Sequence, residues 1–213
     1  KLFAARDYFG IKPYYYAQID GELLFGSEIK SFLPYPKFNK EVNTLALENY
    51  LTFQYSVLDE TFFKGVYKLK PAHYLTYQNG TLEIKRYWQP KFEPEKDIVA
   101  DPVNGKKLQS AIQEVEDVLL DSVGMHTVVS DVEVGSFSGV DSSFVAATFR
   151  NGMDKESGKT FTVGFDYEKY NEIGYAEELS KYVGIESNSK IISTDEYWES
   201  LPKVQYHMDE PLA

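Results

Sequence analysis

Cysteine is absent from the 213 residues of this chain. Its absence excludes disulfide bonds, zinc sites with thiolate ligands and a cysteine nucleophile within these residues. Histidine is scarce, and the three histidines are too scattered in the sequence to give the ligand spacing of a metal site. A chain without cysteine is compatible with the cytoplasm, where we expect this protein to be.

Long apolar runs and positive charge are also lacking. No run approaches the about 20 apolar residues that a membrane span requires, and KLFAARDYFG at the start lacks the order of a signal peptide. There are 22 Lys and Arg against 33 Asp and Glu, for a formal net charge of -11. Because no local Lys/Arg cluster stands out, we expect neither a membrane nor a nucleic-acid partner. An anionic ligand would need backbone N–H groups, a few placed cations or a divalent metal.

Aromatic residues, in contrast, are abundant, with 17 Tyr and 14 Phe in a chain that is 43% hydrophobic. Rings of this size remove enough apolar surface from water to offset the ordering of the chain, which indicates a globular protein. The length suits one large core or two modest ones. We predict two domains, residues 1–92 and residues 93–213.

The first ninety residues alternate short strand-like runs with turn signals. Asp20-Gly21 and Asn79-Gly80 each separate two apolar runs, which is the pattern of an antiparallel hairpin. Short helices are predicted around residues 45–51 and from Ser27 onward. The first half of the chain is therefore predicted to be α+β.

The second half follows a proline-containing connection, QPKFEPEKDIVADPVNGK, at residues 89–106. Apolar residues at three- and four-residue steps then predict a helix over residues 108–122. Strands and helices alternate in the remainder: DVEVGSF, residues 142–150, KTFTVGF, residues 172–183, SKIIS and a helix opening at Thr194. This order predicts parallel strands with crossover helices, and a ligand beyond the carboxyl ends of the strands.

The stretch GSFSGVDSSF, residues 135–144, follows the first of these strands. Small residues, helix-start N–H groups and serine hydroxyls suit an anion, although the stretch has neither the lysine of a Walker A loop nor a G-x-G-x-x-G turn. Asp141 would repel phosphate unless Mg²⁺ bridged the two. Alternatively, Asp141 or Ser142 simply caps a helix, which stabilises it by about 1 kcal/mol.

The segment SFSGVDSSFVAATF resembles the Ser-Gly-Gly-x-Asp-Ser loop of the N-type ATP pyrophosphatases, and its flanks resemble glutamine-hydrolysing asparagine synthetases. Six further segments are similar to that family in the same order: ARDYFGIKPYYY, GELLFGSEIKSFL, YWQP, KTFTVGFD, YNEIGYAEELSKYVG and YHMDEPLA. The resemblance covers nearly the whole chain. It implies part of an N-terminal-nucleophile glutaminase domain of α+β class, followed by an α/β domain with the parallel sheet of the adenine-nucleotide hydrolase-like kind.

The resemblance also implies a ligase reaction. ATP, aspartate and glutamine would give asparagine, AMP, pyrophosphate and glutamate. ATP would first adenylylate the β-carboxylate of aspartate to β-aspartyl-AMP, and ammonia released from glutamine would then displace AMP. The implied cofactors are ATP and Mg²⁺, the partners are these small molecules, and a homodimer is compatible with the resemblance.

Roles for individual residues follow from the same resemblance. The implied pyrophosphate loop contains Ser138, Gly139, Asp141 and Ser142. Asp141 would lie near Mg²⁺. Phe137 and Val163 would approach the nucleotide at the ends of adjacent strands, Val163 through its backbone N–H and C=O groups to adenine. From its place in an apolar strand alone, the side chain of Val163 is expected in the core.

Three acids outside this stretch are further candidates. Asp7 matches the residue that holds the α-amino group of glutamine in the family, whereas the residues alone favour a salt bridge or a turn acid beside Arg6 and Gly10. Asp209 and Glu210 are candidates for the synthetase site, whereas their position alone favours a solvated helix end.

The chain also departs from the family pattern. Its SGVDSS loop is two residues shorter, the family's nucleophilic cysteine is missing, and the family's later Ser-Gly-Glu segment does not follow DEPLA. We therefore expect these residues to belong to a longer enzyme and to be inactive alone. The alternatives are a related amidotransferase or β-lactam-forming enzyme with another acid substrate, and an inactive nucleotide-binding or interaction module.

Overall fold

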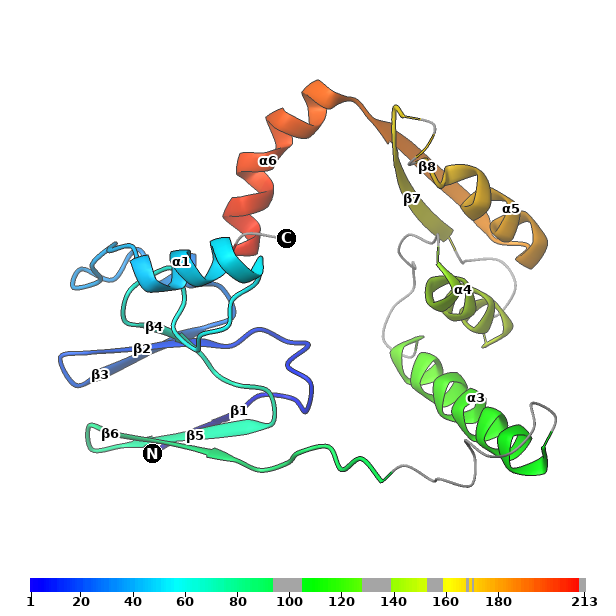
Figure 1. Cartoon of the computed structure of the whole chain (residues 1–213). Coiled ribbons are helices and arrows are strands. Elements are labelled where there is room, and N and C mark those ends of the chain that lie inside the picture. The colour runs from blue at the N-terminus through cyan, green and yellow to red at the C-terminus, as the bar shows by residue number, and fades with distance from the viewer. Residues whose placement is uncertain (94–104, 128–138, 153–158, 168, 170, 211–213) are drawn as a thin grey trace. The chain divides into compact units, whose positions relative to one another are not determined.

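A computed structural model represents the chain (Figure 1). It describes residues 1–93, 105–127, 139–152, 159–167, 169 and 171–210. The fold divides into two compact units, one formed by residues 1–92 with 200–213 and the other by residues 93–199. Within the ranges just given, no helix combines the length and apolar character needed to cross a membrane.

The first unit contains two antiparallel sheets of three strands each, in the orders β1-β5-β6 and β3-β2-β4 (Figure 1). Its strands are β1 Leu2–Ala5, β2 Tyr15–Ile19, β3 Glu22–Gly26, β4 Val66–Lys68, β5 His73–Gln78 and β6 Thr81–Arg86. Its helices are the 3₁₀ helix η1 Ile29–Phe32, the α-helix α1 Thr44–Phe53 and the end of α6 Thr194–Met208. The α+β class predicted for this part of the chain is confirmed.

Both predicted hairpins are present. Asp20 and Gly21 join β2 to β3 with φ of 49° and 78°, and Asn79 and Gly80 join β5 to β6 with φ of 52° and 81°. Two consecutive positive φ angles define a tight turn whose twist matches that of the flanking strands. The sequence signal succeeded because Asp, Asn and Gly tolerate this backbone conformation better than other residues.

The core of the first unit has two clusters that meet at β2. Tyr15 packs with Ile29, Phe32 and Val66, whereas Tyr16 packs with Leu69 and Leu75. Neighbouring residues of a strand point to opposite faces, so β2 is covered on both sides. The second cluster joins the two sheets, because β2 and β5 belong to different ones.

Helix η1 differs from the sequence prediction. The predicted helix began at Ser27, but the observed one begins at Ile29 and has only four residues of 3₁₀ type. Pro34 follows two residues after its end, and proline has no backbone N–H with which to continue the hydrogen bonds of a helix. In contrast, α1 is a regular helix capped by Asn43, whose side chain accepts the Ala46 N–H at 3.2 Å.

The second unit is an α/β arrangement (Figure 1). Its elements are α3 Lys106–Thr127, α4 Val140–Gly152, β7 Lys159–Phe165, α5 Ile173–Val183, β8 Glu186–Ile192 and the beginning of α6 Thr194–Met208. Strands β7 and β8 are parallel and connected through α5, as predicted. The strand predicted at DVEVGSF lies outside the described residues.

Helix α5 covers one face of β7. Thr160 is buried on that face, and its hydroxyl lies 3.0 Å from the hydroxyl of Ser180 in α5. The opposite face carries Phe161, Val163 and Phe165, which are 41%, 50% and 47% exposed. The expectation that the Val163 side chain belongs to the core is therefore wrong, because residues of one strand alternate between a covered and an open face.

Gly164 permits the close approach of α5 to β7. A Cβ atom at this position would lie 2.6 Å from Asn171 Oδ1 and 2.7 Å from Ile173 Cδ1. We expect Gly164→Ala to lower the free energy of unfolding by about 1–3 kcal/mol, because the neighbours must shift. Urea denaturation of the full-length protein measures the loss. The control is Gly174→Ala, where a Cβ meets nothing within 4 Å; equal losses in both variants would contradict the prediction.

Candidate functional site

Asp7 organises the turn that follows β1. Its Oδ1 atom accepts the N–H groups of Phe9 at 3.2 Å and Ile11 at 2.9 Å, and its Oδ2 atom accepts the N–H of Lys12 at 3.0 Å. These bonds, that from Lys12 foremost, lower the pKa of the carboxyl group, so Asp7 is ionised at neutral pH. A carboxylate has about four lone-pair sites, which leaves acceptor capacity for a bound ammonium group. The turn acid expected from the residues alone is thus observed.

The Arg6 side chain also holds this turn, through hydrogen bonds to backbone carbonyl groups. Its guanidinium donates to the carbonyl oxygens of Lys12 at 2.9 Å, Gly10 at 2.7 Å and Leu69 at 2.5 Å. Burial lowers the pKa of the guanidinium, and the nearby Asp7 carboxylate opposes that shift. Sequence reasoning did not recognise this role of Arg6. The signal that could have indicated it is the position of Arg6 beside the turn acid Asp7 and four residues before Gly10.

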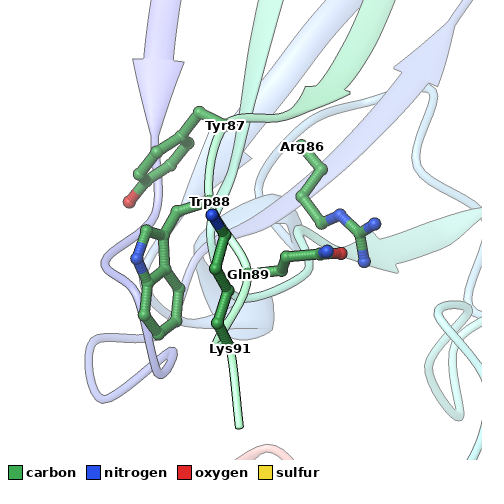
Figure 2. Close-up of a pocket in the computed structure, with 5 residues that line it drawn as sticks. All are labelled: Arg86, Tyr87, Trp88, Gln89 and Lys91. Carbon is green, nitrogen blue, oxygen red and sulfur yellow. The ribbon is translucent and has the colours of Figure 1, made fainter. Parts of the chain in front are cut away.

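A surface hollow adjoins the turn, with a volume of about 650 Å³ (Figure 2). It is lined by Arg86, Tyr87, Trp88, Gln89 and Lys91, and is called the 86–91 hollow below. Figure 2 shows the two rings on one side of the segment and the Arg86 guanidinium on the other. Two cationic side chains, Arg86 and Lys91, line the hollow, which suits a small ligand with an anionic group.

Aromatic contacts connect this hollow to the Asp7 turn. The Tyr87 hydroxyl donates to the Arg6 carbonyl at 2.6 Å. The Trp88 ring lies 5.0 Å from the Tyr8 ring and 5.4 Å from that of Phe9, measured between centroids. The YWQP segment and the ARDYFG segment, distant in sequence, are therefore parts of one surface region.

In the second unit, the serine-rich stretch leads into α4. The first helical hydrogen bond runs from the Ser143 N–H to the Gly139 carbonyl at 3.0 Å, and the helix begins at Val140. Asp141 and Ser142 therefore lie in the first turn, and the alternative that one of them is the N-cap residue is wrong. Phe137 and Ser138 lie outside the described residues.

The first turn of α4 has the features of an anion site. The N–H groups of a first helical turn have no acceptor further back in the helix, and the helix dipole adds positive potential there. Asp141 is exposed beside them. In the described part of the chain, no group of three His, Asp or Glu could hold a metal ion. A single carboxylate still fits Mg²⁺, which commonly binds one or two carboxylates together with phosphates and water.

An apolar hollow of about 530 Å³ lies between α3 and α4, with Asp141 on its lining. The apolar residues around it are Ile112, Val115, Leu119, Val140, Phe144 and Val145. The first turn of α4 therefore contributes both an exposed charged residue, Asp141, and an apolar residue, Val140, to the lining of this hollow. The structure brings Gly139, Asp141 and Ser142 together at this helix start.

Asp209 and Glu210, after α6, belong to the first unit. The Glu210 carboxylate forms an ion pair with Lys68 and accepts the Ser56 hydroxyl at 3.3 Å. Asp209 Oδ1 accepts the N–H of Lys30 at 3.3 Å. The alternative of a solvated helix end is therefore wrong, since the Glu210 side chain is only 14% exposed. Their place in a synthetase site stays a prediction.

Comparison with known proteins gives two family matches along the chain. The model described as "Glutamine amidotransferase domain" matches residues 1–88, and the model described as "Asparagine synthase" matches residues 114–213. Asparagine synthetase (glutamine-hydrolyzing) 1 of Bacillus subtilis is 37% identical over 215 residues, which cover 100% of this chain and 32% of that protein. The chain resembles glutamine-hydrolysing asparagine synthetases along its whole length.

Other relatives extend the comparison. A putative asparagine synthetase (glutamine-hydrolyzing) of Mycobacterium tuberculosis is 34% identical over 220 residues, covering 100% of this chain and 32% of that protein. The amidase chyE of Penicillium rubens is 31% identical over 230 residues, covering 99% of this chain and 32% of that protein. The chain thus spans about a third of the length of these relatives.

The candidate residues divide between the two matched regions. Asp7 and Arg6 lie in the amidotransferase match. So do the residues of the 86–91 hollow up to Trp88, whereas Gln89 and Lys91 follow the match. Asp141 and Val163 belong to the asparagine synthase match, as do Asp209 and Glu210. The resemblance to asparagine synthetases predicted from the sequence is confirmed.

Proposed function

We propose that this chain works in an ATP-dependent ligase that amidates aspartate to asparagine with ammonia from glutamine. The observation that carries the proposal is the order of the two family matches, an amidotransferase region followed by an asparagine synthase region, in relatives named asparagine synthetase. ATP would activate the β-carboxylate of aspartate as β-aspartyl-AMP, and ammonia would then form the amide and release AMP. The ATP supplies the leaving group that a free carboxylate lacks.

In the amidotransferase region, we assign Asp7 to the α-ammonium group of glutamine. Its geometry supports this role, because three backbone N–H groups hold the carboxylate in one orientation and keep it ionised. Arg6 fixes the turn from the other side through three carbonyl groups. Such a rigid anion reduces the ordering that a substrate would otherwise have to impose.

In the synthase region, the proposed ATP site lies at the start of α4. Its residues are Phe137, Ser138, Gly139, Asp141, Ser142 and Val163. Support comes from the helix start at Val140, whose first-turn N–H groups suit pyrophosphate. Asp141 would hold Mg²⁺, which would supply charge neutralisation between the phosphates. The parallel pair β7–β8 is compatible with the proposed sheet of the N-type ATP pyrophosphatase kind.

The proposed domains are residues 1–92, as the end of the amidotransferase domain, and residues 93–213, as the start of the synthetase domain. The family matches, which leave residues 89–113 unassigned, are compatible with a boundary there. The compact units differ at the other end, because residues 200–213 belong with the first unit. A cytoplasmic location and a homodimer are further predictions.

A second candidate is amidation of a different acid. The similarity to the amidase chyE favours it, because that relative carries another name while matching 99% of this chain. The same glutamine and ATP machinery would serve either reaction, so the acid substrate alone separates the two candidates.

The test is a steady-state assay of the full-length gene product with ATP, Mg²⁺, L-aspartate and either glutamine or ammonia. We expect asparagine and AMP in equal amounts, and no AMP without aspartate. ADP in place of AMP would contradict adenylylation. Amide formation from another carboxylic acid, with aspartate inert, would support the second candidate instead.

A further inference from the structure

The end of α6 joins the two family-defined parts of the chain. Residues 200–210 lie within the asparagine synthase match, yet they pack in the compact unit that contains the amidotransferase match. The contacts made by these residues are therefore contacts between the two matched regions within one unit. Tyr206, Asp209 and Glu210 make them.

The main contact is the ion pair of Glu210 with Lys68 of β4. The side chains of Glu210 and Lys68 are only 14% and 28% exposed, whereas those of the pair Glu41–Lys64 on the same unit are 50% and 61% exposed. The Ser56 hydroxyl provides a further hydrogen bond to Glu210 at 3.3 Å. Because water screens the Glu210–Lys68 pair less, removal of one partner would leave a poorly hydrated charge.

Lys30 of η1 makes the second contact. Its ammonium donates to the Tyr206 carbonyl at 3.1 Å and lies 4.9 Å from the Tyr206 ring centroid. Its backbone N–H donates to Asp209 at 3.3 Å, and its ammonium also pairs with Glu28 at 2.8 Å. Lys30 and Lys68 of the amidotransferase region thus both bind residues 206–210. Lys30 binds the Asp209 carboxylate through its backbone N–H, and Lys68 binds the Glu210 carboxylate through its ammonium.

A chain of contacts leads from Glu210 to the Asp7 turn. Lys68 is followed by Leu69, whose carbonyl accepts the Arg6 guanidinium at 2.5 Å. Arg6 then holds the turn through its remaining bonds. Burial lowers the pKa of the Arg6 guanidinium, and the negative charge of Glu210 opposes this shift because it favours the charged form.

We propose that Glu210 and Lys68 are positioning residues: their ion pair lets the asparagine synthase region hold the Asp7 turn in its glutamine-binding geometry. This role rests on the proposed function of Asp7. In this role both residues act through the Arg6 contact rather than on the reacting atoms. Glutamine would bind at full affinity only while the end of α6 is docked, which links ammonia production to the presence of the synthase region.

The kinetic test uses Lys68→Met in the full-length gene product. We expect the KM for glutamine to rise about tenfold, because the unpaired Glu210 disturbs β4 and hence the Arg6 contact. Ammonia-dependent asparagine synthesis should stay within about twofold of the wild type, since it does not use the Asp7 turn. Lys68→Arg should restore a KM near the wild-type value, because it keeps the charge.

The matched control is Lys64→Met, which breaks the exposed pair with Glu41 in the same unit. It should leave both activities unchanged. A KM for glutamine that is equal in the Lys68→Met and Lys64→Met variants would overturn the proposal. So would a parallel fall of glutamine- and ammonia-dependent synthesis in Lys68→Met, which would indicate a general structural role.

A second measurement detects the contact without using activity. A water-soluble carbodiimide joins a paired lysine and glutamate by an amide bond, and peptide mass spectrometry locates the link. We expect a Lys68–Glu210 link in the full-length protein, with the Lys64–Glu41 link as a positive control. Detection of the Lys64–Glu41 link without a Lys68–Glu210 link would show that this contact does not form, and would overturn the proposal.

The proposed function fails separately if the full-length protein makes no asparagine from either glutamine or ammonia.

Discussion

Asp141→Asn in the full-length protein is expected to lower ATP-dependent amidation by about 10²-fold or more, the usual effect of losing one group that stabilises phosphate charge. The carboxylate is exposed in the first turn of α4, beside N–H groups that suit pyrophosphate. Asparagine keeps the shape of the side chain but binds Mg²⁺ far less strongly, because it has no charge. The rate of AMP formation at saturating aspartate measures the loss.

Stability provides the decisive comparison for this variant. Removing a negative charge from a first helical turn costs only about 0.3–1 kcal/mol, so thermal unfolding should change little. The matched control is Asp195→Asn, which removes an exposed acid from the first turn of α6. The control should keep wild-type activity. An Asp141→Asn enzyme that is fully active, or one whose loss follows its unfolding, would contradict the assignment.

Gly10→Ala is expected to lower the free energy of unfolding by about 2–4 kcal/mol, the sum of backbone strain and steric overlap. The residue has a φ of +68°, and a Cβ atom there would lie 2.8 Å from Pro71 Cγ and 2.9 Å from Arg6 Cζ. The Arg6 guanidinium would be displaced from the carbonyls that it binds. The KM for glutamine should therefore rise as well, because the Asp7 turn loses its support.

Urea denaturation and glutamine kinetics measure the two effects of this change. The control is Gly21→Ala. Gly21 has a φ of +78°, and a Cβ atom added there meets no atom within 4 Å. It carries the backbone strain alone, about 1–2 kcal/mol, and should leave glutamine kinetics unchanged. Losses of the same size in both variants would show that the Pro71 and Arg6 contacts contribute nothing.

Local signals in the sequence predicted most of the elements. The Asp20-Gly21 and Asn79-Gly80 turns, α1, α3 and the end of α5 at Gly184 all depend on neighbours within a few residues of the chain. Turn geometry, capping and helical periodicity are properties of such short stretches. The parallel pairing of β7 with β8 followed from the order of the elements.

Long-range contacts could not be predicted in the same way. The pairing of β1 with β5 and the ion pair of Lys68 with Glu210 join residues that are far apart in sequence, and no spacing rule encodes them. The exposure of Val163 depends on which face of β7 the helix α5 covers. A strand pattern shows that two faces differ, but it does not show which elements of the chain pack on each.

The candidate site was only partly predictable. The sequence alone left Asp7 between a turn acid and a salt bridge, and the structure shows backbone N–H groups as its partners. It placed Asp141 near a helix start but could not fix the first helical residue, which is Val140. Helix ends inferred from sequence shift easily by a residue or two, enough to separate a cap from a first-turn ligand.

The distance in sequence between β1 and β5 has a consequence during translation. Residues 2–5 pair with residues 74–77, so β1 is synthesised before its partner β5 and must wait for it. At about 5–20 residues per second, roughly 70 residues take about 4–14 s to make. The β2–β3 hairpin forms within microseconds of its emergence, as hairpins do. Strand β1 of the nascent chain therefore stays without its β5 partner long after the β2–β3 hairpin has formed, and chaperones on the ribosome can reach it during that time.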